Sequence, residues 1–139
     1  MITVEEALKI VYAHLGHWGT EEIFLDQSLG RILQEEIVAD RDFPPFNRVT
    51  MDGIGLSFDQ FDKGQRVFEI KGVAPAGGLQ QELPDPSYCL EVMTGATVPI
   101  GIDVVVRYED LEILEGKATV RLSSLNRNQN IHFKGSDRH

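Results

Sequence analysis

The hydrophobic pattern near the amino terminus predicts an amphipathic helix. Thr3 and Glu6 have the spacing of a capping box, in which each residue satisfies a backbone N–H group of the other. After Thr3, apolar side chains recur every three or four residues, as along one face of a helix: Val4, Ala7, Leu8, Val11 and Leu15. Gly16 follows and offers a helix end. We therefore expect a first helix between Thr3 and Gly16.

The next apolar pattern predicts a second, shorter helix over residues 27–33. Asp26 or Ser28 lies near its start, and three residues form its apolar stripe: Leu29, Ile32 and Leu33. The apolar run at residues 37–39 indicates a brief extended segment that follows this helix.

A diproline then marks a change in character. Phe43-Pro44-Pro45-Phe46 excludes helix, because consecutive prolines hold the backbone extended. The pattern before it is helical, whereas short apolar segments and turn residues alternate after it. We place the boundary here, between a helical and extended segment, residues 1–45, and a β-rich domain, residues 46–139.

The β-rich part contains several short apolar segments. The predicted strands are 53–58, 66–73, 88–93, 103–108 and 117–122. Glycine and proline clusters separate them: Gly77-Gly78, Pro84-Asp85-Pro86, Pro99-Ile100-Gly101 and Glu115-Gly116. This spacing is typical of a small antiparallel barrel or sandwich. The expected fold class is α+β, with a helical and extended N-terminal segment and a small antiparallel β-barrel-like domain.

The composition limits the class of protein and its expected cellular location. The chain is 42% hydrophobic and 25% charged, as in a globular protein, and no apolar run is long enough to cross a membrane. Glu5 and Glu6 occupy the place of a signal peptide's basic region. Cys89, the single cysteine, cannot form an internal disulfide. We expect a cytoplasmic protein without a membrane partner.

The net charge of −9 argues against a nucleic-acid partner, because a field of that sign repels phosphate backbones. Any site for an anionic ligand must therefore gather backbone N–H groups, lysines, arginines or metal ions locally. The sequence shows few candidates for that role.

Two short motifs contain candidate site residues. In Thr50-Met51-Asp52-Gly53, Asp-Gly is most often a turn, and the alternative is that the turn holds Asp52 toward a ligand or metal. In Met93-Thr94-Gly95-Ala96, the small residues leave room for a ligand to approach the main chain. From spacing alone, a turn with a capping threonine is the more common outcome there too.

Other polar features are weaker. The charges that follow the valines of 103–108 indicate a solvated strand end. Lys134 and Asp137 lie in a polar stretch that reads as an exposed loop, yet they could serve an anionic ligand and a metal, respectively. His14 and His17 lack further ligands at zinc spacing, and no phosphate-binding glycine loop occurs. Cys89 is interpreted as a core residue.

Taken in order, these segments resemble the amino-terminal region of the molybdopterin molybdenumtransferases, the MoeA family with gephyrin-type relatives. The matching segments are Ser28–Leu33, Phe43–Phe46 with Met51–Gly53, Met93–Ala96 with Val98, Pro99 and Gly101, Asp103–Val106 with Glu109 and Asp110, and Gln129–Ile131 with Gly135 and Asp137. Each is weak alone, but their shared order over nearly the whole chain makes the resemblance specific.

The resemblance implies a fold and a reaction. The fold is a helical and extended segment involved in homodimer contacts, with an inserted barrel-like domain. The reaction inserts molybdate into the dithiolene of adenylylated molybdopterin and hydrolyses off the adenylyl group, with a divalent metal, Mg²⁺, as cofactor. Such chemistry needs metal-assisted phosphoanhydride cleavage and an oxyanion pocket.

Carried over by motif, Asp52, Thr94 and Asp137 are the expected catalytic residues. Asp52 and Asp137 are the expected metal ligands. Thr94, Gly95 and Lys134 are expected to bind the substrates.

The chain departs from the family pattern in two places. The family's usual Asp-Asn-Ser-Ala before Met-Asp-Gly is Asn47-Arg48-Val49-Thr50 here, which brings in a cation and a β-branched apolar residue. The family's pterin-binding α/β domain and its small β-domain do not occur in these 139 residues. In the family, the site lies between that α/β domain and the barrel-like domain of the other subunit.

Two functions follow. In the first, the chain is part of a full-length enzyme, supplies one wall of the active site and is inactive alone. In the second, it is a non-catalytic dimerisation or scaffold module that binds another cofactor-synthesis protein, such as the molybdopterin-adenylylating enzyme.

Overall fold

The computed structural model describes residues 2–16 and 18–137. The chain forms two compact units, Met1–Ile37 and Val38–His139, and each is described by itself below. The predicted division into residues 1–45 and 46–139 stays a prediction.

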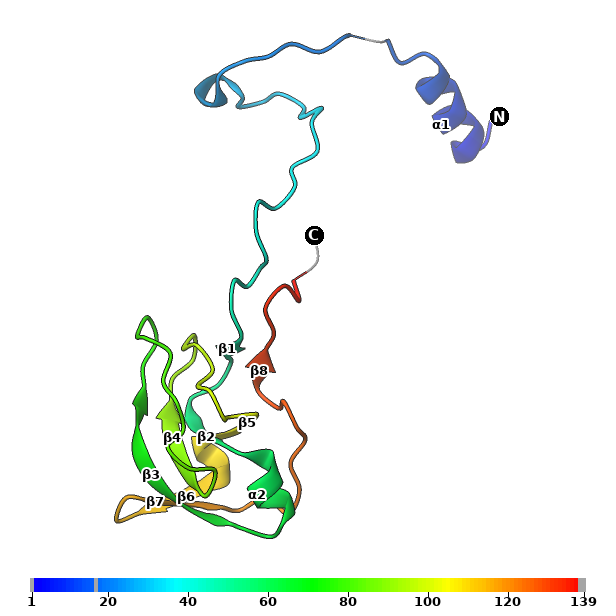
Figure 1. The fold of residues 1–139 in the computed structure, drawn as a ribbon. Coiled ribbons are helices and arrows are strands. Elements are labelled where there is room, and N and C mark those ends of the chain that lie inside the picture. The colour runs from blue at the N-terminus through cyan, green and yellow to red at the C-terminus, as the bar shows by residue number, and fades with distance from the viewer. Residues whose placement is uncertain (1, 17, 138–139) are drawn as a thin grey trace. The chain divides into compact units, whose positions relative to one another are not determined.

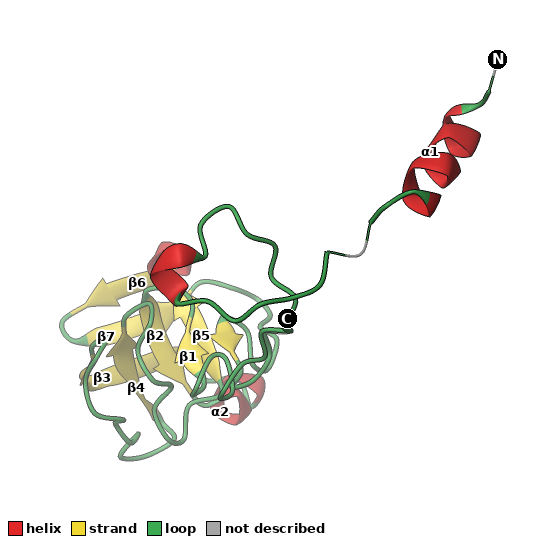
Figure 2. Cartoon of the chain, turned by 90° about the horizontal axis from the view of Figure 1, so that it is seen from above, coloured by secondary structure: helices red, strands yellow, loops and turns green. Residues whose placement is uncertain are grey.

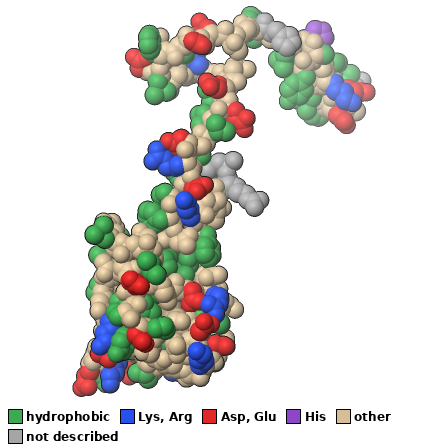
Figure 3. All heavy atoms as spheres, in the orientation of Figure 1, with side chains coloured by type: hydrophobic (Ala, Val, Ile, Leu, Met, Phe, Trp, Pro, Cys, Tyr) green, Lys and Arg blue, Asp and Glu red, His purple; other side chains and the backbone are tan. Residues whose placement is uncertain are grey.

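Helix α1, Val4–Ala13, confirms the first predicted helix and its capping box. The Glu6 N–H donates to Thr3 Oγ1 at 3.2 Å, and the Thr3 N–H donates to Glu6 Oε2 at 2.8 Å. The helix ends before the expected Gly16, because His14 caps it and its Nδ1 lies 2.7 Å from the Ile10 carbonyl oxygen. His17 lies outside the described residues. The large apolar side chains of α1 are exposed, and Figure 3 shows apolar atoms at the surface of this helix.

The second predicted helix, 27–33, is wrong. The structure has only a 3-10 turn there, η1, at Leu25–Gln27. Gly30 has a φ of +79°, which ends any helical path, and Leu29 is 96% exposed. Short helices depend on a packed apolar face, and nothing within the described residues covers this one. The apolar run at 37–39 does not form a strand either.

The second unit holds a six-stranded sheet and a two-stranded ribbon (Figure 1). The sheet strands are β2, Gly53–Leu56; β3, Val67–Ala74; β4, Tyr88–Val92; β5, Val104–Arg107; β6, Leu111–Leu114; and β7, Lys117–Val120. Their order is β5-β2-β4-β3-β7-β6. The ribbon pairs β1, Arg48–Val49, with β8, Ile131–His132.

The sheet curls into a half-barrel, as Figures 1 and 2 show, and the α+β class is confirmed. All five predicted strands are present, although each is shorter or shifted at its ends. The pair β3–β4 is parallel, unlike the antiparallel pairs elsewhere in the sheet. Helix α2, Phe58–Asp62, and the 3-10 turn η2, Tyr108–Asp110, complete the unit.

Each face of the sheet covers its own hydrophobic core, because side chains alternate along a strand. Ile54 and Val106 belong to one core, and Val92 and Val105 belong to the other. Cys89 is fully buried in the first core, as predicted. Burial, followed by the charge of Glu91, raises the pKa of its thiol to about 12.

The segment that follows β7 covers the free edge of β5. The Asn128 N–H donates to the Asp103 carbonyl at 2.7 Å, and the Val105 N–H donates to the Gln129 carbonyl at 3.1 Å. The Asn130 side chain donates to the Val105 carbonyl at 2.9 Å. These bonds occupy backbone groups that an uncovered edge strand would leave open to another chain.

Candidate functional site

Strand ends bring Asp52 and Thr94 together. Asp52 directly precedes β2, and Thr94 lies two residues beyond β4, the neighbour of β2 in the sheet. Asp52 Oδ1 accepts the Thr94 backbone N–H at 2.6 Å and the Thr94 hydroxyl at 2.8 Å. Both residues are exposed. Two residues predicted from separate motifs thus form one carboxylate–hydroxyl pair at the end of the sheet.

Gly53 allows Asp52 to reach this position. A Cβ atom on Gly53 would lie 1.9 Å from the Val106 carbonyl oxygen on β5. Asp-Gly therefore does not form a hairpin turn here; the glycine is needed because two backbones approach closely at the start of β2.

The Met93–Ala96 segment is a β-turn, as its spacing predicted. The Ala96 N–H donates to the Met93 carbonyl at 2.9 Å, and Gly95 has a φ of +86°, which suits glycine at the third position of such a turn. The Gly95 N–H donates to the Val49 carbonyl at 2.8 Å, which ties the turn to β1. Thr94 is thus held on a fixed turn.

The environment of Asp52 favours its charged form. The backbone hydrogen bond from Thr94, then the hydroxyl bond from the same residue, lowers the pKa of Asp52, and the small degree of burial opposes this. The carboxylate is therefore ionised at neutral pH and attracts cations or hydrogen-bond donors.

Tyr108 and Glu91 belong to the same end of the sheet, and the sequence did not single them out. The Tyr108 N–H donates to the Asp52 carbonyl at 3.3 Å, and its hydroxyl donates to Glu91 Oε1 at 3.0 Å. Burial, this hydrogen bond and the charges of Glu91 and Asp52 raise the pKa of Tyr108 to about 12. Only the strand register, which places Tyr108 beside Asp52, could have revealed this contact.

Lys134 and Asp137 lie in a second cluster, next to the ribbon. Lys134 Nζ is 3.3 Å from Asp42 Oδ2, and the Lys134 N–H donates to Asn47 Oδ1 at 2.9 Å. Asp137 Oδ1 lies 2.6 Å from His132 Nε2. An open hollow beside this cluster is lined by Ala39, Asp40, Arg41, Asp42, Pro45 and Lys134. Within the described residues, no hydrogen bond or ion pair joins this cluster to Asp52 or Thr94.

The described residues do not assemble a metal site by themselves. Within ranges 2–16 and 18–137, no group of three or more histidine, cysteine, aspartate or glutamate side chains is placed to hold a metal ion. Asp52 and Asp137 lie in different clusters, so they do not fit a shared divalent ion on this chain alone. Their roles as metal ligands stay predictions.

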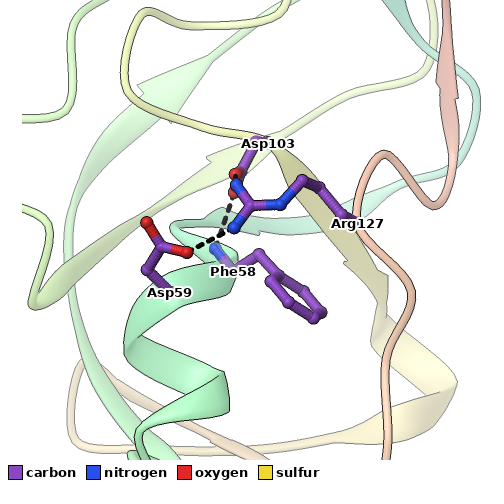
Figure 4. Close-up of polar contacts among 4 residues, drawn as sticks. All are labelled: Phe58, Asp59, Asp103 and Arg127. Carbon is purple, nitrogen blue, oxygen red and sulfur yellow. Dashed lines mark hydrogen bonds and ion pairs between the residues drawn. The ribbon is translucent and has the colours of Figure 1, made fainter.

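The remaining charged residues near these strands have structural partners. Arg107 and Asp110 form a salt bridge at 2.9 Å, in agreement with a solvated strand end. Arg127 bridges Asp59 and Asp103, and its guanidinium lies 4.8 Å from the centre of the Phe58 ring (Figure 4). Asp103 also accepts the Phe58 N–H at 2.6 Å. This cluster fastens the segment after β7 to helix α2.

The fold and the site together define a class of protein: an α+β domain with a curled mixed sheet and a carboxylate–hydroxyl pair held at strand ends. The family model described as MoeA N-terminal region (domain I and II) matches residues 2–139. The chain belongs to this family.

Curated relatives match most of this chain. Molybdopterin molybdenumtransferase of Synechocystis sp. is 42% identical over 120 residues, which cover 86% of this chain and 31% of the relative. The protein of the same name from Staphylococcus epidermidis is 34% identical over 140 residues, which cover 98% of this chain and 33% of the relative. The chain thus spans about a third of the length of these relatives.

Solved structures agree with this family membership. Two crystal structures of a molybdopterin biosynthesis MoeA protein from Pyrococcus horikoshii superpose with TM-scores of 0.76 and 0.69, at 29% and 26% identity. Each covers 96% of this chain, and the matched regions are 36% and 35% of those chains. None of the helices described in our structure has the length and apolar character needed to cross a membrane.

Proposed function

We propose that this chain is the N-terminal part of a molybdopterin molybdenumtransferase and supplies one wall of its active site. In the proposed reaction, molybdate enters the dithiolene of adenylylated molybdopterin, and the adenylyl group is hydrolysed off. The names of the relatives and the family match support this class of reaction. The Asp52–Thr94 pair carries the proposal within this chain.

The pair suits a substrate-positioning role. Asp52 accepts two hydrogen bonds through Oδ1, so its other oxygen, Oδ2, can accept a donor from a ligand. The Thr94 hydroxyl donates to Asp52 and retains acceptor capacity toward the same ligand. A rigid turn and a strand end fix both groups, and fixed groups lose little freedom when a ligand binds.

We further propose that the protein acts as a cytoplasmic homodimer. The N-terminal unit supports this, because its described apolar side chains are largely exposed, as Trp18 at 94% and Leu29 at 96% show. Apolar surface of this extent marks protein–protein contacts more often than free surface.

The test uses the full-length protein that contains this chain. Asp52→Asn removes the carboxylate charge and replaces one acceptor oxygen with an NH2 donor, and Thr94→Val removes the hydroxyl donor, each with little change in volume. We expect each to lower the rate of molybdenum insertion about 100-fold, the effect of losing precise positioning. The measurement is reconstitution of a molybdenum enzyme from adenylylated molybdopterin and molybdate.

Asp85 and Ser87 provide a matched control. Asp85 Oδ1 accepts the Ser87 N–H at 2.8 Å and its hydroxyl at 2.5 Å, so this surface turn has the same bonding as the site pair. Asp85→Asn should leave insertion unchanged. Normal insertion by both Asp52→Asn and Thr94→Val would instead favour a dimerisation or scaffold module that binds another cofactor-synthesis protein.

A further inference from the structure

Strand β1 contains an arginine without an acidic partner. Arg48 is exposed, and no salt bridge of Arg48 occurs within the part of the chain that the structure describes. Of the six other described arginines, five pair with a carboxylate: Arg31, Arg41, Arg107, Arg121 and Arg127. The sixth, Arg66, donates to the Phe61 and Gln65 carbonyls and lies over the Phe61 ring, so its guanidinium is occupied without an acid. In a chain with a net charge of −9, an arginine left unpaired is available to an anion from outside.

The strand pairing places Thr97 beside Arg48. The Val98 N–H donates to the Asn47 carbonyl at 2.9 Å, and the Val49 N–H donates to the Ala96 carbonyl at 2.9 Å. Arg48 and Thr97 are therefore a non-hydrogen-bonded antiparallel pair, the arrangement in which side chains on one face come closest. Because the neighbouring Val49 is fully buried, Arg48 projects on the opposite, outer side.

His132 occupies the other side of Arg48. It is the register partner of Arg48 across the ribbon. His132 Nε2 contacts Asp137 Oδ1 at 2.6 Å and Ser136 Oγ at 3.1 Å. Ser136 Oγ donates its hydrogen to the Phe133 carbonyl at 2.6 Å, so the single His132 Nε2–H is shared between Asp137 Oδ1 and Ser136 Oγ. His132 therefore contacts the Asp137 carboxylate, and the Arg48 guanidinium has no salt bridge within the described residues.

We propose that Arg48 and Thr97 form a binding site for a tetrahedral oxyanion, either a phosphate group or molybdate. A guanidinium donates two parallel hydrogen bonds to such an ion, and a neighbouring hydroxyl donates a third. The sequence Asn47-Arg48-Val49-Thr50, which departs from the family's usual run, thus gains a specific role.

The site deepens the proposed function, on which its biological meaning rests, because both substrates of that reaction contain tetrahedral oxyanions. It is continuous with the Asp52–Thr94 pair through the backbone. Val49, next to Arg48, accepts the Gly95 N–H at 2.8 Å, and Gly95 follows Thr94 directly. An oxyanion held by Arg48 and Thr97 would therefore lie next to the turn that presents Thr94, because Thr97 directly follows that turn.

The test measures anion binding directly in the full-length protein. Inorganic phosphate and sodium molybdate are titrated separately, and the arginine side-chain signals are followed by NMR after isotope labelling. We expect Arg48→Gln to weaken binding about tenfold, as expected for the loss of a charge-assisted hydrogen bond. Thr97→Val should weaken it less, and added salt should weaken wild-type binding. Arg121→Gln, which alters an exposed arginine paired with Glu112, is the matched control.

Each outcome is decisive. Loss of phosphate binding, molybdate binding or both in Arg48→Gln, with Arg121→Gln unchanged, supports the site and identifies its ligand. Equal affinities in wild type and Arg48→Gln, or no binding of either anion by the wild type, overturn it. Molybdenum insertion is measured in parallel. Anion binding at Arg48 without insertion activity would refute the proposed function alone. Normal insertion together with unaltered anion affinity in Arg48→Gln would refute this site alone.

Discussion

Replacing Gly53 by alanine places a methyl group where β2 runs against β5. The new Cβ would lie 1.9 Å from the Val106 carbonyl oxygen, 2.8 Å from its carbonyl carbon and 2.9 Å from the Arg107 Cα atom. All three are backbone atoms, so a side-chain rotation cannot relieve the overlap. The two strands must separate by about 1.1 Å to bring the closest contact to 3.0 Å.

That separation converts to a sizeable loss of stability. A ladder hydrogen bond near 2.9 Å that lengthens by about 1 Å is no longer a hydrogen bond. Two or three such bonds at this end of the β2–β5 pair, at about 1 kcal/mol each, predict a loss of about 3 kcal/mol in the free energy of unfolding. Asp52, the adjacent residue, would move with the strand, so molybdenum insertion should fall as well.

Urea denaturation followed by circular dichroism measures this loss, and about 3 kcal/mol corresponds to a midpoint shift of about 1–2 M. Gly72→Ala is the matched control within the same sheet. Its Cβ would make an ordinary 3.5 Å contact with Leu90 Cδ2. Gly72→Ala should therefore be neutral or slightly stabilising. A Gly53→Ala midpoint equal to that of Gly72→Ala would refute the close-approach argument.

Two further results are expected. Cys89 should not react with a thiol reagent at pH 8 in the folded protein, because it is fully buried and its pKa is raised to about 12; rapid labelling without denaturant would contradict its placement in the core. The lowered pKa of Asp52 means that its ionised carboxylate stabilises the folded protein. This contribution to the free energy of unfolding is complete at pH values above 3.8, the ordinary pKa of an aspartate, and is lost as the pH falls through the lower pKa of the folded state. Unfolding measured from pH 7 to pH 2 should therefore show the difference between wild type and Asp52→Asn narrowing in acid; a constant difference would argue against the Thr94 bonds.

The sequence predicted the strands well because their signals are local. Val104–Arg107 and Tyr88–Val92 combine β-branched or aromatic residues with flanking turn residues, and both occur as strands. The helix expected at 27–33 failed because its apolar stripe has no packing surface within the described residues. Strand β6 was missed although Glu115-Gly116 marks the hairpin that follows it, since Leu-Glu-Ile-Leu fits a strand or a helix equally well.

The candidate site was only partly predictable. Motifs identified Asp52 and Thr94, but 42 positions separate them in the chain, and only the pairing of β2 with β4 shows that they bond to each other. Tyr108 could not be found, because its importance depends on the register between β2 and β5. Arg48 stood out as a departure, yet its surroundings depend on contacts with Thr97 and His132 from distant segments.

The ribbon has a mechanical consequence. Beyond β1 and β8 the two segments stay paired, since the Gly135 N–H donates to the Pro44 carbonyl and the Asp137 N–H to the Phe43 carbonyl, each at 3.0 Å. The chain thus enters and leaves the half-barrel at the same place. A pulling force applied at Phe43 and Asp137 would stretch and break the hydrogen bonds of the ribbon one after another. The ribbon should therefore open at low force while the sheet, which the force does not yet reach, stays folded.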